Sequence, residues 1–446
     1  MQFNDLNISK PILDALADLG YDQPTTIQQK AFPVILSGKD VVGIAQTGTG
    51  KTFAYLIPLL RDWKFSKQSS LQILILVPTR ELVEQVVSEV RKLSKYLTLR
   101  VVGVYGGTNI NTQMTDVNKG ADILVATPGR LIDLNNKGVV RLKNIKKLVI
   151  DEVDEMLNQG FRHQLHNIVD LLAERRQNIM FSATMTKDVE IFIDYAFDTP
   201  DKIEAAPSGT PLEKIKQSCF VLPNFNTKIN LLKLLLKEEN TMSKVLVFTS
   251  TKEIADRLYE LLEPKHNGKI GIIHSNKSQN FRLNSVRQFH AGNFNILIAT
   301  DLVARGLDIA EVSHVINFGL PEIPENYIHR IGRTGRADKE GIAISLVTER
   351  EIKRLEAIEE FMKFEVQREA LPENLEISKT LTKDEMPKVQ MPNMDVKFGV
   401  YEPSGAAFHE KKAKNMKENF SLTRGEKLKL KYGKPKTRGQ KKKGGK

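Results

Sequence analysis

The sequence predicts an α/β protein with two parallel-sheet domains and a basic C-terminal tail. Short apolar, β-branched runs alternate with longer stretches of helical period throughout residues 35–360, a pattern typical of βαβ units. The 446 residues suffice for two or three domains, and we expect two. Residues 405–446 hold 15 Lys and Arg against 3 Glu, whereas the other 404 residues hold 51 basic and 51 acidic groups. The whole net charge of +12 therefore lies in one tail, which has few apolar residues and is expected to be disordered.

The expected strands fall into two series separated by a linker. The first series comprises Val41–Ile44, Ile73–Val77, Arg100–Val104, Ile123–Ala126, Leu148–Ile150 and Asn178–Phe181. The second comprises Lys244–Phe248, Ile270–Ile273, Ile296–Ala299, Val315–Asn317 and Ile342–Val347. We therefore expect a domain over residues 1–205, a linker over 206–215 and a domain over 216–365. Residues 366–446 are a Pro-containing polar extension and tail, to which no fold is assigned.

Composition limits the class of protein. The chain is 41% hydrophobic and 27% charged, the balance of a globular protein in water. Its apolar runs fall well short of the roughly 20 residues that span a bilayer, so no membrane partner is expected. The N-terminal residues lack the basic start and apolar middle of a secretory signal, which predicts a cytoplasmic location. Cys219 is the single cysteine, which excludes an internal disulfide, and it is expected to be a small buried side chain.

A phosphate-binding loop follows the first expected strand. It consists of Ala45, Gln46, Thr47, Gly48, Thr49, Gly50, Lys51 and Thr52, and a helical pattern begins directly after it. The glycines permit a tight backbone whose N–H groups cradle phosphates at a helix N-terminus. Lys51 is expected to reach the β- and γ-phosphates, and Thr52 to bind Mg²⁺. Ala45 stands where such loops usually have glycine, a small change. The loop predicts binding of a nucleoside triphosphate with Mg²⁺.

An acid pair completes the predicted nucleotide site. Asp151 and Glu152 follow the expected strand Leu148–Ile150, where carboxylates at a strand end would face the loop. Asp151 can hold Mg²⁺ through water, and Glu152 can orient the water that attacks the γ-phosphate. Upstream, Tyr21 offers a ring for stacking and Gln28 a carboxamide that can pair with adenine. Without further context, Tyr21 and Gln28 are better explained as an ordinary core aromatic and a surface amide.

These residues closely resemble the DEAD-box RNA helicase family over roughly residues 1–365. The Gln28 segment with Phe3 resembles its Q motif, residues 45–52 its motif I and residues 151–154 its motif II. Further matches are Pro78–Leu82, Gly106–Gly107, Thr127–Arg130, Ser182–Thr184, Gln279 with Arg282, Ala299–Asp308 and His329–Arg336. The resemblance implies two tandem RecA-like domains, each a mainly parallel sheet with helices on both faces, which close together on ATP and RNA.

Two positions depart from the family pattern. Val153 replaces the alanine of motif II, and Ser275 replaces a glycine after His274. The two added methyl groups of Val153 require only local space, so we expect activity to survive. Ser275 leaves the backbone geometry of its turn open.

The resemblance also implies roles for residues of both domains. Arg333 and Arg336 resemble arginine fingers that reach the γ-phosphate, a contribution that can be worth about 10³ to 10⁵ in rate. Further nucleotide contacts are implied for Asp154, Gly306 and Asp308. Interdomain coupling is implied for Ser182, Thr184, Asp301, His329 and Arg330, with His329 and Arg330 expected to bond to Ser182, Thr184 and the motif II acids. RNA backbone contacts are implied for Arg80, Gly107, Thr127, Arg130, Thr249, Gln279, Arg282 and Thr300, which predicts low sequence specificity.

The resulting expectation is an ATP-dependent RNA helicase: an RNA-dependent ATPase that locally unwinds or remodels RNA duplexes and RNA–protein complexes. One alternative is an ATP-gated RNA clamp or assembly scaffold that turns over slowly because Val153 misplaces the acids. Another is a DNA translocase. The core is expected to be monomeric. The tail is either a solvating segment or a salt-sensitive tether for RNA, and ribosome assembly, RNA decay and translation all remain open as settings.

Overall fold

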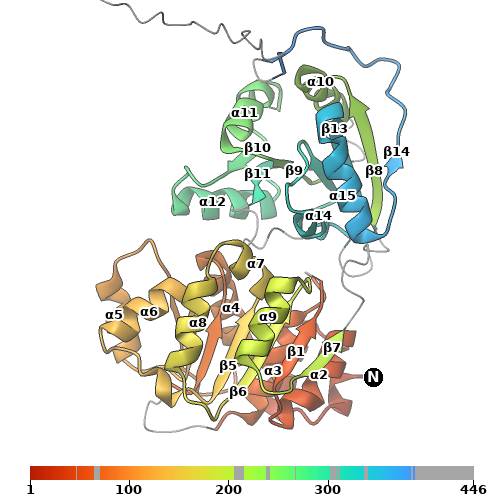
Figure 1. The fold of residues 1–446 in the computed structure, drawn as a ribbon. Helices are drawn as coiled ribbons and strands as arrows, with labels where there is room; N and C mark the ends of the chain where they lie inside the picture. Colours follow the sequence, from red (N-terminus) through yellow and green to blue (C-terminus); the bar gives the residue numbers. More distant parts are fainter. Residues whose placement is uncertain are drawn as a thin grey trace, which may run out of the picture. The chain divides into compact units, whose positions relative to one another are not determined.

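The computed structural model describes residues 1–46, 48–64, 71–204, 215–237, 242–266, 268–301, 309, 312–335, 340–382 and 385–386 (Figure 1). Met1–Met386 form one compact unit, which contains two seven-stranded sheets. We call residues 1–204 the first lobe and 215–386 the second lobe. The predicted linker, except for residue 215, and the basic tail lie outside the described residues, as do Thr47, Gly306, Asp308 and Arg336.

The first lobe is a parallel sheet in the order β3-β4-β2-β5-β6-β1-β7. Its strands are β1 Val41–Ile44, β2 Ile73–Leu76, β3 Val101–Val104, β4 Ile123–Ala126, β5 Lys147–Asp151, β6 Gln177–Ser182 and β7 Asp201–Glu204. Its helices are α1 Lys10–Asp18, α2 Thr26–Leu36, α3 Lys51–Asp62, α4 Arg80–Leu93, α5 Ile110–Asn118, α6 Pro128–Asn136, α7 Val153–Asn158, α8 Arg162–Leu171 and α9 Lys187–Ala196, with short 3₁₀ turns η1 Phe3–Asp5 and η2 Leu142–Asn144. The six strands expected for this lobe are confirmed.

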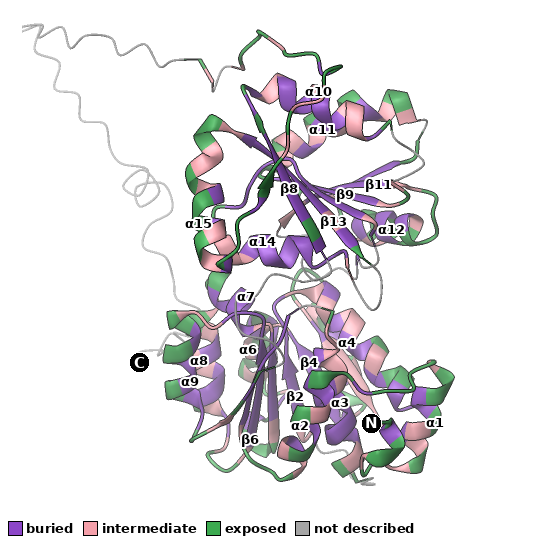
Figure 2. Ribbon diagram, turned by 90° about the vertical axis from the view of Figure 1, so that its right-hand side faces the viewer, coloured by how far each residue is buried: buried purple, intermediate pink, exposed green. Residues whose placement is uncertain are grey.

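Alternate residues of each strand supply two separate apolar layers in the first lobe. Val41 belongs to the cluster under α1 to α4, whereas its neighbour Val42 belongs to the cluster under α6 to α9. Successive side chains of a strand point to opposite faces, so a sheet covered on both sides needs strands that are apolar throughout. Figure 2 shows these strands buried between exposed helix surfaces. Helices on both faces are therefore confirmed.

The second lobe repeats this architecture in the order β10-β11-β9-β12-β13-β8-β14, again with parallel pairs. Its strands are β8 Ile215–Leu222, β9 Val245–Thr249, β10 Ile270–Ile273, β11 Ile296–Thr300, β12 His314–Asn317, β13 Gly341–Thr348 and β14 Gln367–Arg368. Its described helices are α10 Phe225–Leu235, α11 Lys252–His266, α12 Gln279–His290, α14 Pro324–Ile331 and α15 Ile352–Met362, with the 3₁₀ turn η3 Glu349–Glu351. Cys219 lies buried in β8, as expected.

The second lobe extends beyond its expected end at residue 365. Strand β14 pairs with β8, and Val366 and Leu375 are buried. Three asparagine side chains near the start of α10 then hold the backbone of the following segment: Asn224 donates to the Ser378 carbonyl at 2.6 Å, Asn226 to that of Thr380 at 2.7 Å and Asn230 to that of Glu376 at 2.9 Å. We call residues 366–386 the C-terminal strap. Its sparse apolar residues give no periodic signal, which is why the sequence assigns it no fold.

Among the described residues, no helix is both long enough and apolar enough to cross a membrane.

Candidate nucleotide and RNA site

The phosphate-binding loop connects β1 to α3, as the sequence predicts. Gly48 and Gly50 have φ angles of 84° and 87°, and Gly50 is the residue that caps the N-terminus of α3. The backbone angle of Gly50 requires glycine, and a side chain there would also displace the Gln28 carboxamide, because its Cβ would lie 2.5 Å from Nε2 of Gln28. The Ala45 N–H donates to the Ser182 carbonyl at 3.0 Å, which continues the β1–β6 ladder into the loop.

Lys51 is the first residue of α3 and is buried. Its Nζ has no hydrogen-bond partner within the described part of the chain. Burying a charged amine without a partner is costly, and the N-terminus of a helix favours negative charge nearby. The residues present therefore fit a phosphate group, which would supply the missing partner of Lys51.

Asp151 and Glu152 lie at the carboxyl end of β5. Oδ1 of Asp151 accepts a hydrogen bond from the Glu152 N–H at 3.0 Å, and Oδ2 accepts one from the Tyr55 hydroxyl at 3.0 Å. Burial raises the pKa of Asp151, against the opposing charge of Lys51. Burial also raises the pKa of Glu152 to about 7, again opposed by Lys51. A carboxyl with such a pKa can accept a proton near neutral pH.

Asp154 joins the motif II segment to the Ser182–Thr184 segment. Its Oδ2 accepts from the Ala183 N–H at 3.2 Å, the Thr184 N–H at 3.0 Å and the Thr184 hydroxyl at 2.9 Å. Nε2 of His329 lies 3.8 Å from the same oxygen. Burial acts to raise the pKa of Asp154, but the charges of His329 and Lys51 prevail and lower it. Asp154 thus lies beside His329 of the second lobe.

Arg330 differs from the sequence expectation. Its guanidinium donates to both carboxylate oxygens of Asp301, at 2.5 and 2.7 Å, to the Gly319 carbonyl at 2.6 Å and to Oδ1 of Asn317 at 3.3 Å. It also lies over the Phe248 ring, 5.1 Å from the centroid. These partners all belong to the second lobe, so the described contacts of Arg330 do not reach Ser182 or Thr184. The physical reason is burial. A fully buried guanidinium needs a partner for its donors, and the neighbours that supply these partners all lie in the second lobe.

Arg333 is buried just beyond α14. Its positive charge acts on Glu152, where it opposes the rise in pKa. Asp301, held by Arg330, lies directly after β11. Arg333 therefore brings a second-lobe charge to the site of the predicted chemistry.

The residues that resemble the Q motif lie beside the phosphate-binding loop or in the core next to it. The Gln28 side chain donates to the Gly50 carbonyl at 3.1 Å and accepts from the Thr25 N–H at 3.0 Å. Tyr21 is half exposed and meets the Phe53 ring edge-on, with centroids 5.3 Å apart. Phe3 is buried in the core. Gln28 thus connects α2 to the phosphate-binding loop, and an exposed ring remains at Tyr21 for a base to contact.

The expected RNA residues of the first lobe lie at the N-terminal ends of α4 and α6 and in the loop after β3. Gly107 has a φ angle of 81°. Arg130, on α6, donates to Oε1 of Gln113 at 2.7 Å and to the Thr108 carbonyl at 2.9 Å. Thr127 caps α6, and its N–H donates to the Val104 carbonyl at 3.1 Å. These bonds fix Arg130 and Thr127 beside the loop that contains Gly107.

The expected RNA residues of the second lobe lie at the ends of β9 and β11 and in the first turn of α12, which follows β10. Thr249 and Thr300 are paired neighbours at the ends of β9 and β11. Gln279 begins α12, and its Oε1 accepts a hydrogen bond from Arg282. Arg282 also lies 3.3 Å from Glu81, which accepts from Arg80 at 3.2 Å. Glu81 thus forms ion pairs with two arginines that are expected to bind RNA, Arg80 of the first lobe and Arg282 of the second.

The sequence did not single out Tyr55, Glu81, Gln113 or Asn317, although each contacts a predicted site residue. Tyr55 follows Lys51 by one helical turn, a spacing that places both on one face of α3. That spacing is the one signal that could have identified Tyr55. The others depend on contacts between segments distant in sequence.

Two family models match the chain. The DEAD/DEAH box helicase model matches residues 25–192, and the helicase conserved C-terminal domain model matches residues 227–338. These ranges fall in the first and second lobes respectively and include the phosphate-binding loop, the motif II acids and Arg333.

Individual relatives agree with the family models. The chain is 40% identical over 354 residues to the DEAD-box ATP-dependent RNA helicase RhpA of Helicobacter pylori, covering 79% of this chain and 71% of RhpA. It is 39% identical over 366 residues to the DEAD-box ATP-dependent RNA helicase CshA of Geobacillus kaustophilus, covering 82% and 78%.

Solved structures share the two-lobed architecture. S. cerevisiae Dbp5 bound to RNA and ADP BeF3 aligns with a TM-score of 0.75 at 29% identity, covering 82% of this chain and 95% of Dbp5. A DEAD box protein from the hyperthermophile Methanococcus jannaschii aligns with a TM-score of 0.52 at 38% identity, covering 83% and 99%. With this fold, this phosphate-binding loop and these relatives, the chain belongs to the DEAD-box family of ATP-dependent RNA helicases.

Proposed function

We propose that this RNA-dependent ATPase, which remodels RNA, hydrolyses ATP at a site built from Lys51, Asp151 and Glu152. The observation that carries the proposal is the buried amine of Lys51, whose Nζ lacks a hydrogen-bond partner among the described residues and whose charge acts on both carboxyls. A cation held in this way, at the start of a helix and beside two acids, suits a nucleotide phosphate and its metal ion.

The residues of the first lobe divide the chemistry among them. Lys51 and the N–H groups of the loop bind the phosphates. Thr52 and Asp151 would hold Mg²⁺, which supplies positive charge to the phosphate oxygens when bound. Glu152 orients a water molecule and accepts its proton as the water oxygen bonds to the γ-phosphorus and the bond to the ADP oxygen breaks. The pKa of about 7 makes Glu152 a competent proton acceptor at neutral pH.

The second lobe supplies positive charge to the transferring phosphoryl group. Arg333 is proposed as one arginine finger, supported by its electrostatic effect on Glu152. Arg336 is proposed as the other from sequence alone, as are Gly306 and Asp308 as nucleotide contacts. His329, 3.8 Å from Asp154, would make hydrolysis depend on the approach of the second lobe.

RNA is proposed to contact the eight backbone-reading residues named above, four in each lobe. They include hydroxyls, a glycine and arginines, which bind phosphates and 2′-hydroxyls without reading bases. Ribosomal or RNA-decay assemblies as partners, a monomeric core and a cytoplasmic location are further parts of the proposal. Crosslinking the protein to RNA in cells would identify the RNA.

The ATP-gated clamp has less support. It requires Val153 to misplace the acids, but the Val153 side chain is fully buried in the apolar cluster under α6 to α9, and Asp151 and Asp154 each keep their hydrogen bonds.

The test compares ATP hydrolysis by the full chain with RNA, with DNA and without nucleic acid. RNA should stimulate hydrolysis more than DNA does, and Glu152→Gln should abolish it. Equal rates with and without RNA would contradict the proposal, and stronger stimulation by DNA would favour a translocase.

A further inference from the structure

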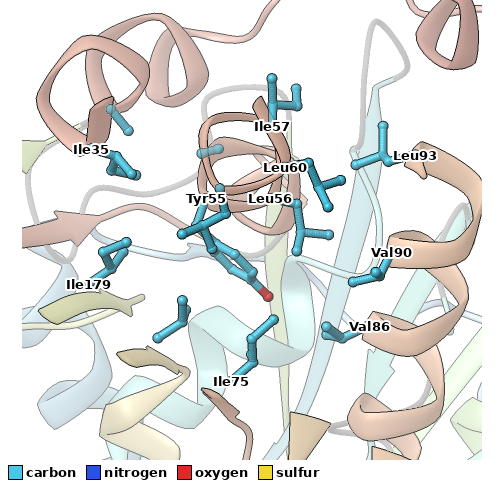
Figure 3. Close-up of a cluster of buried hydrophobic side chains, with 14 of the residues drawn as sticks. Ile35, Tyr55, Leu56, Ile57, Leu60, Ile75, Val86, Val90, Leu93 and Ile179 are labelled. Carbon is cyan, nitrogen blue, oxygen red and sulfur yellow. The ribbon is translucent and has the colours of Figure 1, made fainter. Parts of the chain in front are cut away.

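Tyr55 carries a hydroxyl into the apolar core of the first lobe. The side chain is fully buried, and Figure 3 shows its ring among Ile35, Ile75, Val86 and Ile179, with the hydroxyl oxygen pointing inward between them. Phenylalanine would fill this place without a polar atom. A buried hydroxyl is costly unless it has a hydrogen-bond partner, so its presence requires one.

The partner is the metal-side carboxylate. The Tyr55 hydroxyl donates to Oδ2 of Asp151 at 3.0 Å, and both groups are buried. Thr52, on the same helix α3, lies near enough to the Tyr55 hydroxyl to oppose the rise in its pKa that burial causes. Tyr55 therefore contacts one of the residues proposed to hold Mg²⁺, Asp151 at the end of β5, and lies near the other, Thr52.

Together with the Glu152 N–H, Tyr55 fixes the plane of the Asp151 carboxylate. The N–H holds Oδ1 at 3.0 Å, and the hydroxyl holds Oδ2. Each carboxylate oxygen has two lone pairs, so these bonds leave a second direction on each oxygen for a metal-bound water. Partners that orient a ligand in this way commonly set the strength of metal binding.

We propose that Tyr55 is a positioning residue for the Mg²⁺ that accompanies ATP. Its hydroxyl ties the Asp151 carboxylate to α3, the helix that carries Thr52, so that α3 and β5 present the metal ligands as one rigid pair. The inference rests on the Mg²⁺ site proposed above and extends it to a residue outside the loop and motif II.

The experiment measures binding of a fluorescent, non-hydrolysable ATP analogue to the full chain as Mg²⁺ is varied. Tyr55→Phe should leave the affinity measured in EDTA unchanged and raise the Mg²⁺ concentration for half-maximal enhancement about tenfold. The matched control is Tyr327→Phe, which removes another fully buried hydroxyl, 3.2 Å from Oε1 of Gln217 in the second lobe. This control should leave the Mg²⁺ dependence unchanged.

A double-mutant cycle with Asp151→Asn separates positioning from a general packing role. If Tyr55 acts through the Asp151 carboxylate, Tyr55→Phe should have little further effect on Mg²⁺ dependence in the Asp151→Asn background. An unchanged Mg²⁺ dependence in folded Tyr55→Phe, or equal effects in both backgrounds, would overturn the inference. A wild-type chain that binds the analogue without any Mg²⁺ dependence would overturn the Mg²⁺ site itself.

Discussion

At Glu152 the chain leaves β5 in a left-handed backbone conformation, with φ 53° and ψ 49°. This conformation is uncommon outside glycine, asparagine and aspartate and is typical of residues held for function. It turns the chain sharply between Asp151 and α7. The same turn places the carboxyl where burial raises its pKa to about 7.

The raised pKa of Glu152 predicts a pH dependence of ATP hydrolysis. A proton acceptor works only as the carboxylate, so activity is present above pH 7 and falls as the pH drops through 7. Because kcat/KM reports ionisations of the free enzyme, its value for ATP at pH 6 should be about tenfold below the plateau. The measurement is kcat/KM at saturating RNA from pH 5.5 to 8, with circular dichroism to verify folding. A flat profile between pH 6 and 8 would argue against Glu152 as the acceptor.

Val153 is a packing residue, and its substitution should affect stability more than catalysis. It is fully buried, so Val153→Ala removes two methyl groups from the core and should cost about 1 to 2 kcal/mol of unfolding free energy. RNA-stimulated ATPase per folded molecule should stay within a factor of about two of wild type. Denaturant unfolding and ATPase assays of the same preparations test this. A large gain in ATPase rate on Val153→Ala would instead support the hypothesis of an ATP-gated clamp with slow turnover.

Helix α5 shows how one element prepares a binding loop. Gln113 accepts from Arg130 at 2.7 Å and from the Tyr105 N–H at 3.3 Å, and donates to the Tyr105 carbonyl at 3.2 Å and the Thr108 hydroxyl at 2.9 Å. It is buried and therefore fixes both Arg130 and the loop of Gly107.

Gln113→Leu should weaken RNA binding while ATP binding without RNA stays normal. Leucine keeps the volume but leaves the guanidinium and the loop carbonyl without their partner, which should cost about 1 to 3 kcal/mol of RNA affinity. Fluorescence anisotropy with a short single-stranded RNA measures this loss of RNA affinity. Gln85→Leu is the control, because Gln85 on α4 donates to Glu89 of the same helix at 3.1 Å. Equal losses in the two variants would contradict the role of α5.

The C-terminal strap should be part of the folding unit. A chain ending at 386 keeps Val366, Leu375 and the bonds from α10, whereas a chain ending at 365 loses them. Removing two buried aliphatic side chains should cost about 3 to 6 kcal/mol. Thermal unfolding of the two truncated chains should show a clearly lower midpoint for the shorter one. Equal midpoints would mean that the strap is dispensable.

At the scale of the whole molecule, the net positive charge is confined to the C-terminal end. The body carries equal numbers of basic and acidic groups, and residues 405–446 carry the entire excess. If the tail tethers RNA, deleting it should reduce the steepness with which RNA affinity falls with salt, because fewer counterions are released. RNA binding at several salt concentrations, with and without residues 405–446, tests this. An identical salt slope would identify the tail as a solvating segment.

The sequence predicted the architecture and the loop because both depend on local patterns. Apolar strands such as Ile73–Leu76 and the glycines of the loop signal their structure within a few residues. It missed β7, whose sequence Asp-Lys-Ile-Glu is mostly polar because it pairs on one side, with β1, at the edge of the sheet. The sequence also predicted the wrong partners for Arg330. A motif identifies the residue, but it does not indicate whether the partners of that residue lie in the same lobe or in the other one.

The anchoring of Arg330 changes how loss of activity at this position should be interpreted. A guanidinium that donates to Asp301 just after β11 and to Asn317 and Gly319 at and after the end of β12, and that lies over an aromatic ring, stabilises the second lobe. Loss of activity on substitution of Arg330 would therefore be explained first by a destabilised second lobe, and not by the loss of a catalytic group. Genetic screens that rank motif residues by phenotype alone would confuse these two causes.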